Sequence, residues 1–194
     1  MQFFHLFRLM PPLQYRGMAM FVAAIIIHSF CGYVLNAQSV RYRDEVFTSL
    51  TRNTSVTYGS ATGINNQPVT LQFEMFQPTN DTETKRPLLI MVHGGGFTTG
   101  SRYDDRILLV CSTFARRGFV TISPSYRLGL ESNSTTSFFE AVLRGSQDIK
   151  ALVRFCKYYS TQLGIDTSLI FVGGGSAGGY IALATAYLDK QSEY

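Results

Sequence analysis

The nine residues FVGGGSAGG, from Phe171 to Gly179, decide how the rest of the sequence is interpreted. An apolar run leads into glycines that surround one serine, which is typical of a strand, a sharp turn and a helix. As G-x-S-x-G centred on Ser176, the stretch is a nucleophile elbow, which exposes a serine hydroxyl above a sheet. As G-x-G-x-x-G, it is a dinucleotide-binding turn, whose backbone amides hold a pyrophosphate. Both motifs join a strand to a helix, so the stretch alone leaves both interpretations open.

A second glycine-rich stretch, HGGGF from His93 to Phe97, follows the apolar run LLIMV. Three consecutive glycines leave the backbone N–H groups uncovered, so this loop can approach another group closely. In ester hydrolysis, N–H groups aimed at the developing oxyanion lower the barrier by roughly 3–4 kcal/mol for one strong donor. The two glycine-rich stretches together therefore favour an ester-hydrolysing site over a phosphate-binding site.

The hydrophobic pattern between and around these motifs alternates between strand and helix. A near-continuous apolar strand before HGGGF indicates a parallel sheet that is covered on both faces. Strands that alternate with helices predict an α/β fold, with a mostly parallel sheet and helices on both faces. We expect strands near 54–63, 69–78, 87–92, 119–128 and 168–172, and helices over Asp104–Arg117, over Ser137–Leu163 and from Ala177 onward.

The motifs HGGGF, SPSYRLG and GGGSAGG, in this order, resemble the esterase and lipase branch of the α/β-hydrolases, which includes carboxylesterases and hormone-sensitive-lipase-like esterases. The resemblance covers roughly Val69–Asp189, the N-terminal half of such a domain. It implies an α/β-hydrolase sheet whose C-terminal part lies outside this sequence. It also implies that Ser176 is the catalytic nucleophile and that the amides of Gly95, Gly96 and Ala177 form the oxyanion hole. The expected substrate is a small-molecule, carbohydrate or lipid ester, and no cofactor or metal is expected.

The dinucleotide interpretation needs an acidic residue at the end of a second strand. Glu193 lies 20 residues after Gly173, but YLDKQSEY contains no strand pattern before it. Such fingerprints also usually open their domain, whereas several elements precede this one. A flavin-binding or nicotinamide-binding protein is therefore the least favoured of the alternatives.

The family's catalytic acid and histidine follow the nucleophile along the chain. Only 18 residues follow Ser176, and none is a histidine. Asp189 is expected on the same helix, about 20 Å along its axis at ~1.5 Å per residue, which is beyond hydrogen-bond reach. By resemblance, His93 is a structural residue of the oxyanion loop. We expect a chain with the nucleophile and oxyanion hole but without the acid and base. A non-catalytic interaction protein on a hydrolase scaffold remains the alternative.

The N-terminus is typical of a secretory signal. Arg8 and Arg16 precede the apolar run Met18–Phe30, and small residues follow it. We predict a signal peptide over residues 1–37, strands and a loop over 38–68, and the hydrolase half-domain over 69–194. The expected location is secreted or periplasmic, and a retained membrane anchor is the alternative.

Composition limits the remaining possibilities. The sequence of 194 residues is 45% hydrophobic and 15% charged, which excludes a disordered chain. A net charge of +4 without a basic run indicates no nucleic-acid partner. By resemblance, Cys111 and Cys156 lie on helices of opposite sheet faces and stay unpaired, and Arg127 forms an ion pair with Asp148.

Overall fold

The computed structural model describes residues 41–188, which belong to one compact unit that begins at Arg41. The predicted signal peptide of residues 1–37 lies outside the described residues, and so do Glu193 and Asp189. The described parts of the segments predicted as 38–68 and 69–194 lie in this one unit, because their strands pair in a single sheet.

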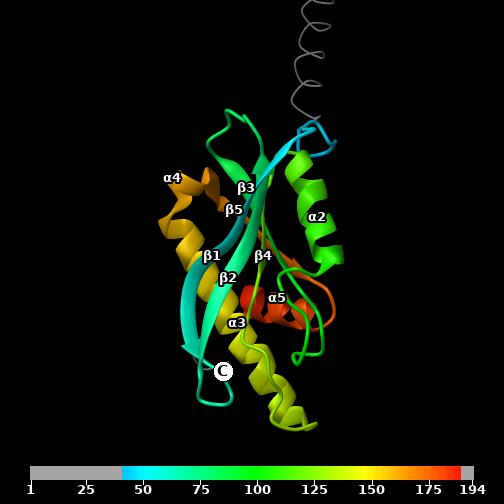
Figure 1. The fold of residues 1–194 in the computed structure, drawn as a ribbon, viewed down its shortest axis with the longest axis vertical. Helices are drawn as coiled ribbons and strands as arrows, with labels where there is room; N and C mark the ends of the chain where they lie inside the picture. The colour runs from blue at the N-terminus through cyan, green and yellow to red at the C-terminus, as the bar shows by residue number, and fades with distance from the viewer. Residues whose placement is uncertain (1–40, 189–194) are drawn as a thin grey trace, which may run out of the picture. The chain divides into compact units, whose positions relative to one another are not determined.

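A five-stranded sheet forms the centre of the unit, with strand order β1-β2-β4-β3-β5 (Figure 1). Strands β3, β4 and β5 are mutually parallel, whereas β2 runs antiparallel to both β1 and β4. The sheet is therefore mixed, with its parallel part where helices connect the strands. The strands span Leu50–Thr62 (β1), Pro68–Pro78 (β2), Arg86–Val92 (β3), Val120–Pro124 (β4) and Ile165–Gly174 (β5).

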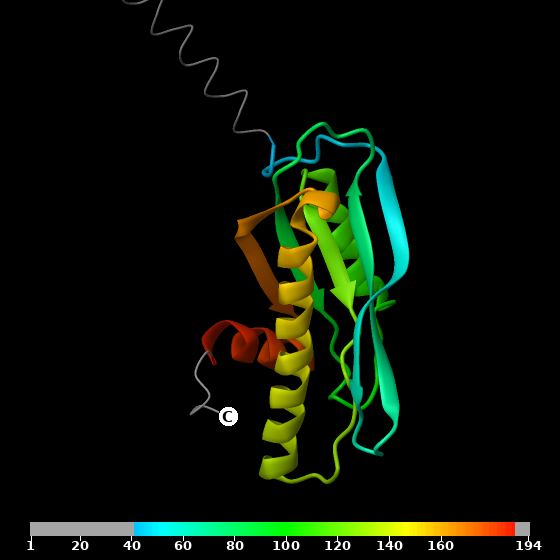
Figure 2. The same ribbon diagram turned by 90° about the vertical axis from the view of Figure 1, so that its left-hand side faces the viewer.

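Helices cover both faces of this sheet, as Figures 1 and 2 show, with α2 on one face and α3 on the other. The predicted single helix over Ser137–Leu163 is wrong in one respect. The chain leaves helical geometry at Tyr159 (φ −95°, ψ 21°), so one further turn forms a separate helix before Gly164. The helices span Asp105–Arg116 (α2), Thr135–Tyr158 (α3), Ser160–Leu163 (α4) and Ala177–Tyr187 (α5).

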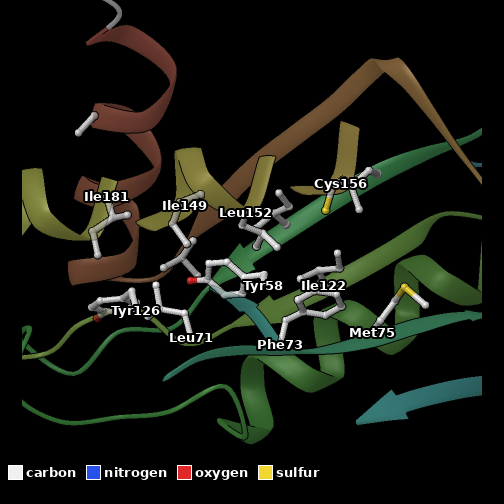
Figure 3. Close-up of a cluster of buried hydrophobic side chains, with 14 of the residues drawn as sticks. Tyr58, Leu71, Phe73, Met75, Ile122, Tyr126, Ile149, Leu152, Cys156 and Ile181 are labelled. Carbon is white, nitrogen blue, oxygen red and sulfur yellow. The ribbon is translucent and has the colours of Figure 1, made fainter. Parts of the chain in front are cut away.

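The pleat of β2 divides the core into two clusters. Leu71, Phe73 and Met75 face α3, where Figure 3 shows Ile149, Leu152 and Cys156 above them. The alternate residue Phe76 packs with Ile107, Cys111 and Ala115 of α2. Cys111 and Cys156 therefore lie in different clusters, and both are free and buried, which confirms that they do not pair.

The chain after β4 is held to α3 by the predicted ion pair. The guanidinium of Arg127 lies 2.8 Å from a carboxylate oxygen of Asp148, and the backbone N–H of Arg127 donates to the same carboxylate at 2.8 Å. Both side chains are largely buried. The contact confirms the predicted pair.

The strand order reverses around β3, and this reversal determines where a site can form. The chain passes from β3 to β4 on one side and then to β5 on the other. Val92 at the end of β3 pairs with Gly174 at the end of β5. The HGGGF and GGGSAGG stretches therefore leave the sheet side by side at its carboxyl edge, where open α/β sheets bind ligands.

Among residues 41–188, no helix combines the length and apolar character that a membrane span requires.

Candidate active site

Ser176 lies in the sharp turn between β5 and α5. Its dihedral angles are φ 52° and ψ −120°, which is rare for a residue with a Cβ atom. Such a conformation costs of order 1–3 kcal/mol and persists only where the surrounding structure imposes it. The side chain is exposed, and it makes no capping bond to α5. The turn therefore presents the hydroxyl outward, as the sequence predicts.

The glycines on both sides of Ser176 are required because the backbone is packed closely there. A Cβ atom on Gly174 would lie 2.4 Å from the carbonyl carbon of Gly178. A Cβ atom on Gly178 would lie 2.2 Å from the carbonyl oxygen of Val92. These contacts explain why the positions two before and two after the serine are the smallest residue.

The loop after β3 is folded by its own backbone. Gly95 has φ +114°, and a Cβ atom there would lie 2.2 Å from the carbonyl oxygen of Thr99. The N–H groups of Thr98 and Thr99 both donate to the carbonyl of Gly95, at 3.1 and 3.0 Å. At Gly94 the loop approaches the serine turn, since a Cβ there would lie 3.3 Å from the Cβ of Ser176.

The two turns enclose one pocket of about 420 Å³, and Gly95, Gly96 and Ser176 all line it. Ala177 is buried as the first residue of α5. Within residues 41–188, the backbone N–H groups of Gly95, Gly96 and Ala177 have no hydrogen-bond acceptor. The pocket thus brings together three of the four residues that the sequence singled out, and the fourth, Ala177, directly follows Ser176 in the chain. The complete lining is Gly94, Gly95, Gly96, Asp104, Arg106, Ile107, Gly175 and Ser176.

The first turn of α2 forms a wall of this pocket that the sequence did not reveal. Asp104 was expected only as a helix start, and it is the N-cap, accepting from the N–H groups of Arg106 and Ile107. Its carboxylate also pairs with the guanidinium of Arg106 at 3.1 Å. The short connection from HGGGF to this helix was the only available sign that the helix start would reach the pocket.

His93 is part of the scaffold of the loop. Its ring is buried, stacks on Tyr126 at 4.5 Å, and has Nδ1 2.7 Å from the carbonyl oxygen of Gly94. The hydroxyl of Tyr126 donates to the carbonyl of His93. Burial lowers the pKa of His93 below its usual value of 6.5, which keeps the ring neutral near pH 7. No hydrogen bond joins His93 to Ser176 within the described residues.

Comparisons with solved structures point to esterases. An esterase from Thermogutta terrifontis with bound propionate is similar to this chain with a TM-score of 0.53 and 29% identity. The match covers 68% of this chain and 44% of that esterase. Thermogutta terrifontis esterase 2 phosphorylated by paraoxon is similar with the same TM-score and 27% identity, over 74% of this chain and 49% of the esterase.

Sequence relatives agree with the structural ones. Carboxylesterase 3 of Pongo abelii is 32% identical over 115 residues, which are 57% of this chain and 19% of the relative. A neuroligin-like protein, glit-1, of Caenorhabditis elegans is 29% identical over 110 residues, 56% of this chain and 14% of the relative. The chain therefore spans less than half the length of the esterase in these two solved structures and a smaller share of the curated relatives.

The family model BD-FAE matches residues 73–194, more than half of the chain and the part that contains both glycine-rich turns. Together with the strand order and the esterase neighbours, this match shows that the chain belongs to the BD-FAE family of carboxylesterase-type α/β-hydrolases.

Proposed function

We propose that this chain carries the nucleophile and the oxyanion hole of a serine carboxylic-ester hydrolase. The observation that carries the proposal is the set of three unpartnered N–H groups, on Gly95, Gly96 and Ala177, beside the exposed hydroxyl of Ser176. Backbone donors that are fixed before the reaction stabilise a developing negative charge without reorganising. The N-terminus of α5 adds a favourable potential for an anion at the same place.

The proposed chemistry follows the acyl-transfer pattern. The Oγ of Ser176 attacks the ester carbonyl carbon, and its proton passes to a general base. The π electron pair of the carbonyl moves onto oxygen, where the N–H groups of Gly95, Gly96 and Ala177 donate to it. Collapse of this intermediate breaks the bond to the alcohol, which leaves with the proton from the base. Water then attacks the acyl carbon and gives one proton to the base. Collapse of this second intermediate breaks the bond to the Oγ of Ser176, which takes the proton back from the base and frees the carboxylic acid.

The base is not among the residues after Ser176, since the chain contains only His5, His28 and His93. His93 is buried and bonded to its own loop, which leaves it unsuited to this role. We therefore propose that the catalytic acid and histidine are supplied from outside residues 1–194. Without them, the chain should show negligible turnover of nitrophenyl esters.

We further propose an ester with a short acyl group as the substrate, because one similar esterase, Est2 of Thermogutta terrifontis, has solved structures with bound propionate and bound butyrate. We also propose that residues 1–37 direct the chain into the secretory pathway.

Chemical rescue of the missing base tests this proposal on the chain itself. The 194-residue chain is incubated with 4-nitrophenyl butyrate and increasing imidazole, and peptide mass spectrometry locates the butyryl group. Imidazole should accept the proton of the serine, so butyrylation of Ser176 should rise with its concentration. The variant Ser176→Ala is the control and should show no butyryl group in this peptide.

Butyrylation spread over surface residues, unchanged in Ser176→Ala, would overturn the assignment of the nucleophile. It would instead favour a non-catalytic protein on the hydrolase scaffold. Rapid turnover without imidazole that depends on Ser176 would show that the chain holds its own base, and His93 would then be the first residue to test.

A further inference from the structure

Glu74 is a buried carboxylate in the middle of the sheet. It lies on β2, has no exposed surface, and faces the side of the sheet that α2 covers. A carboxylate is costly to bury unless charged and hydrogen-bonding partners surround it. Its partners therefore indicate what the fold gains by keeping a charge there.

Three groups donate to this carboxylate, and they come from two different segments. From β1, Arg52 donates to Oε2 at 3.0 Å and the N–H of Ser55 donates to Oε1 at 3.0 Å. Ser55 has φ 55° and lies at a β-bulge, which turns its N–H toward Glu74. The third donor is Arg102, whose Nε lies 3.2 Å from Oε1. Arg102 belongs to the loop that carries the HGGGF stretch.

Arg102 is bound to the sheet from several directions. Its Nη2 donates to the hydroxyl of Tyr103 at 2.6 Å and to the Oγ of Ser55 at 3.1 Å. Its carbonyl accepts from the buried Ser123 of β4 at 2.8 Å. Residue 102 is therefore fixed to β1, β2 and β4 together, and most of its side chain is buried.

Arg102 lies on the loop between residues that line the pocket. Gly95 and Gly96 lie before Arg102, Asp104 lies two residues after it, and all three line the pocket of Ser176. The hydrogen bonds of Thr98 and Thr99 go to Gly95 within the loop, and the carbonyl of Phe97 accepts from the N–H of Gly129 outside it. We propose that Glu74 and Arg102 are positioning residues, which hold the loop of residues 94–104 so that its glycine amides face Ser176. This inference rests on the proposed function, because it concerns the same oxyanion hole.

The cluster contains its own control, because two arginines share one carboxylate. Replacing either with glutamine leaves Glu74 with the other arginine and with the N–H of Ser55, so both variants should fold. Only Arg102 belongs to the pocket loop, whereas Arg52 lies on β1. A general contribution to stability would appear in both variants, and a positioning effect in Arg102→Gln alone.

The test compares hydrogen–deuterium exchange of peptides covering residues 94–104 in the wild-type chain, Arg102→Gln and Arg52→Gln. Losing a charge-assisted hydrogen bond should speed exchange of the hydrogen-bonded amides of this segment, those of Thr98, Thr99 and Asp104, about tenfold in Arg102→Gln. Exchange in peptides of α3 should stay unchanged, and Arg52→Gln should resemble the wild type in the loop. Imidazole-dependent butyrylation of Ser176 should fall about tenfold in Arg102→Gln, and Arg102→Lys should recover part of it by restoring the charge.

Unchanged loop exchange in Arg102→Gln, or an equal increase in Arg52→Gln, would overturn the positioning inference. A wild-type chain whose Ser176 is never butyrylated would instead overturn the proposed function. The exchange data would in that case still decide whether Arg102 holds the loop, so the two failures can be distinguished.

Discussion

At the scale of single residues, the backbone conformation of Ser176 lowers the stability of the fold, so stability does not explain a serine at this position. A glycine would adopt φ 52° without a Cβ penalty, and Ser176 makes no capping bond that would be lost. We expect Ser176→Gly to raise the free energy of unfolding by about 1 kcal/mol in urea titrations while abolishing butyrylation. Ser176→Ala keeps the Cβ atom and should abolish butyrylation without this gain. Equal stability of the two variants would contradict the strain.

Two ion pairs with the same N–O distance contribute differently to the free energy of unfolding when one is buried and the other is exposed. Arg127–Asp148 and Arg43–Asp44 both have N–O distances of 2.8 Å, but the first pair is largely buried and the second is exposed. Removing Asp148 strands a buried guanidinium, so Asp148→Ala should cost about 3–5 kcal/mol of unfolding free energy. Asp44→Ala should cost less than about 0.5 kcal/mol. Similar losses in the two variants, measured by urea unfolding, would refute this ranking.

At the scale of elements, the seating of α5 against β3 depends on the first turn of the helix. A Cβ atom at Gly178 would meet the carbonyl oxygens of Val92 and His93 at 2.2 and 2.7 Å, and backbone cannot yield cheaply. Gly178→Ala should therefore lower the urea midpoint and reduce butyrylation of Ser176. At Gly179 the nearest atom is 3.4 Å away, so Gly179→Ala should be neutral or stabilise by up to about 1 kcal/mol through helix propensity. An unchanged urea midpoint in Gly178→Ala would mean that the first turn of α5 lies farther from the end of β3 than these distances require.

At the scale of the whole molecule, buried carboxylates predict how stability depends on pH. Burial alone raises the pKa of Glu74, but the donors Ser55, Arg52 and Arg102 together hold it below its usual value of 4.5. Burial likewise raises the pKa of Asp81, but Arg41, the N–H of Glu83 and Arg86 together hold it below its usual value of 3.8. The unfolded chain then binds more protons in acid, so stability is present above about pH 4.5 and is lost as the pH falls through the folded-state values.

Urea midpoints measured from pH 7 to pH 3 should therefore decline below about pH 4.5. The decline should be shallower in Glu74→Gln, which no longer titrates at this position. An equally steep decline in the variant would contradict the contribution of Glu74.

The division of the core into two clusters also predicts how the two cysteines react. Burial raises the pKa of the Cys111 and Cys156 thiols to about 12, so few thiolates exist at neutral pH. Both thiols should resist alkylation in the native chain and react fully after denaturation without reductant, as peptide mapping would show. A requirement for reductant would reveal a disulfide and contradict the placement on opposite faces.

The sequence by itself determined much of the fold and of the candidate site. Periodicity located the strands and helices, and Gly164 ended its helix as expected, because these signals act within a few residues. The break at Tyr159 escaped prediction, since the apolar stripe continues through it. Two glycine-rich motifs in order, through their resemblance to the esterase branch, singled out Ser176, Gly95, Gly96 and Ala177 as the candidate site.

Only the tertiary structure decided which of these segments meet. The pairing of Val92 with Gly174 brings the two glycine-rich turns together, although the residues are far apart in the chain. The buried charge of Glu74 could not be foreseen, because a glutamate in an alternating strand normally faces water. Its partners, Arg52 and Arg102, come from separate loops and strands. Local patterns encode elements and turns, whereas contacts between distant residues depend on strand order, which the burial of both faces of the sheet establishes.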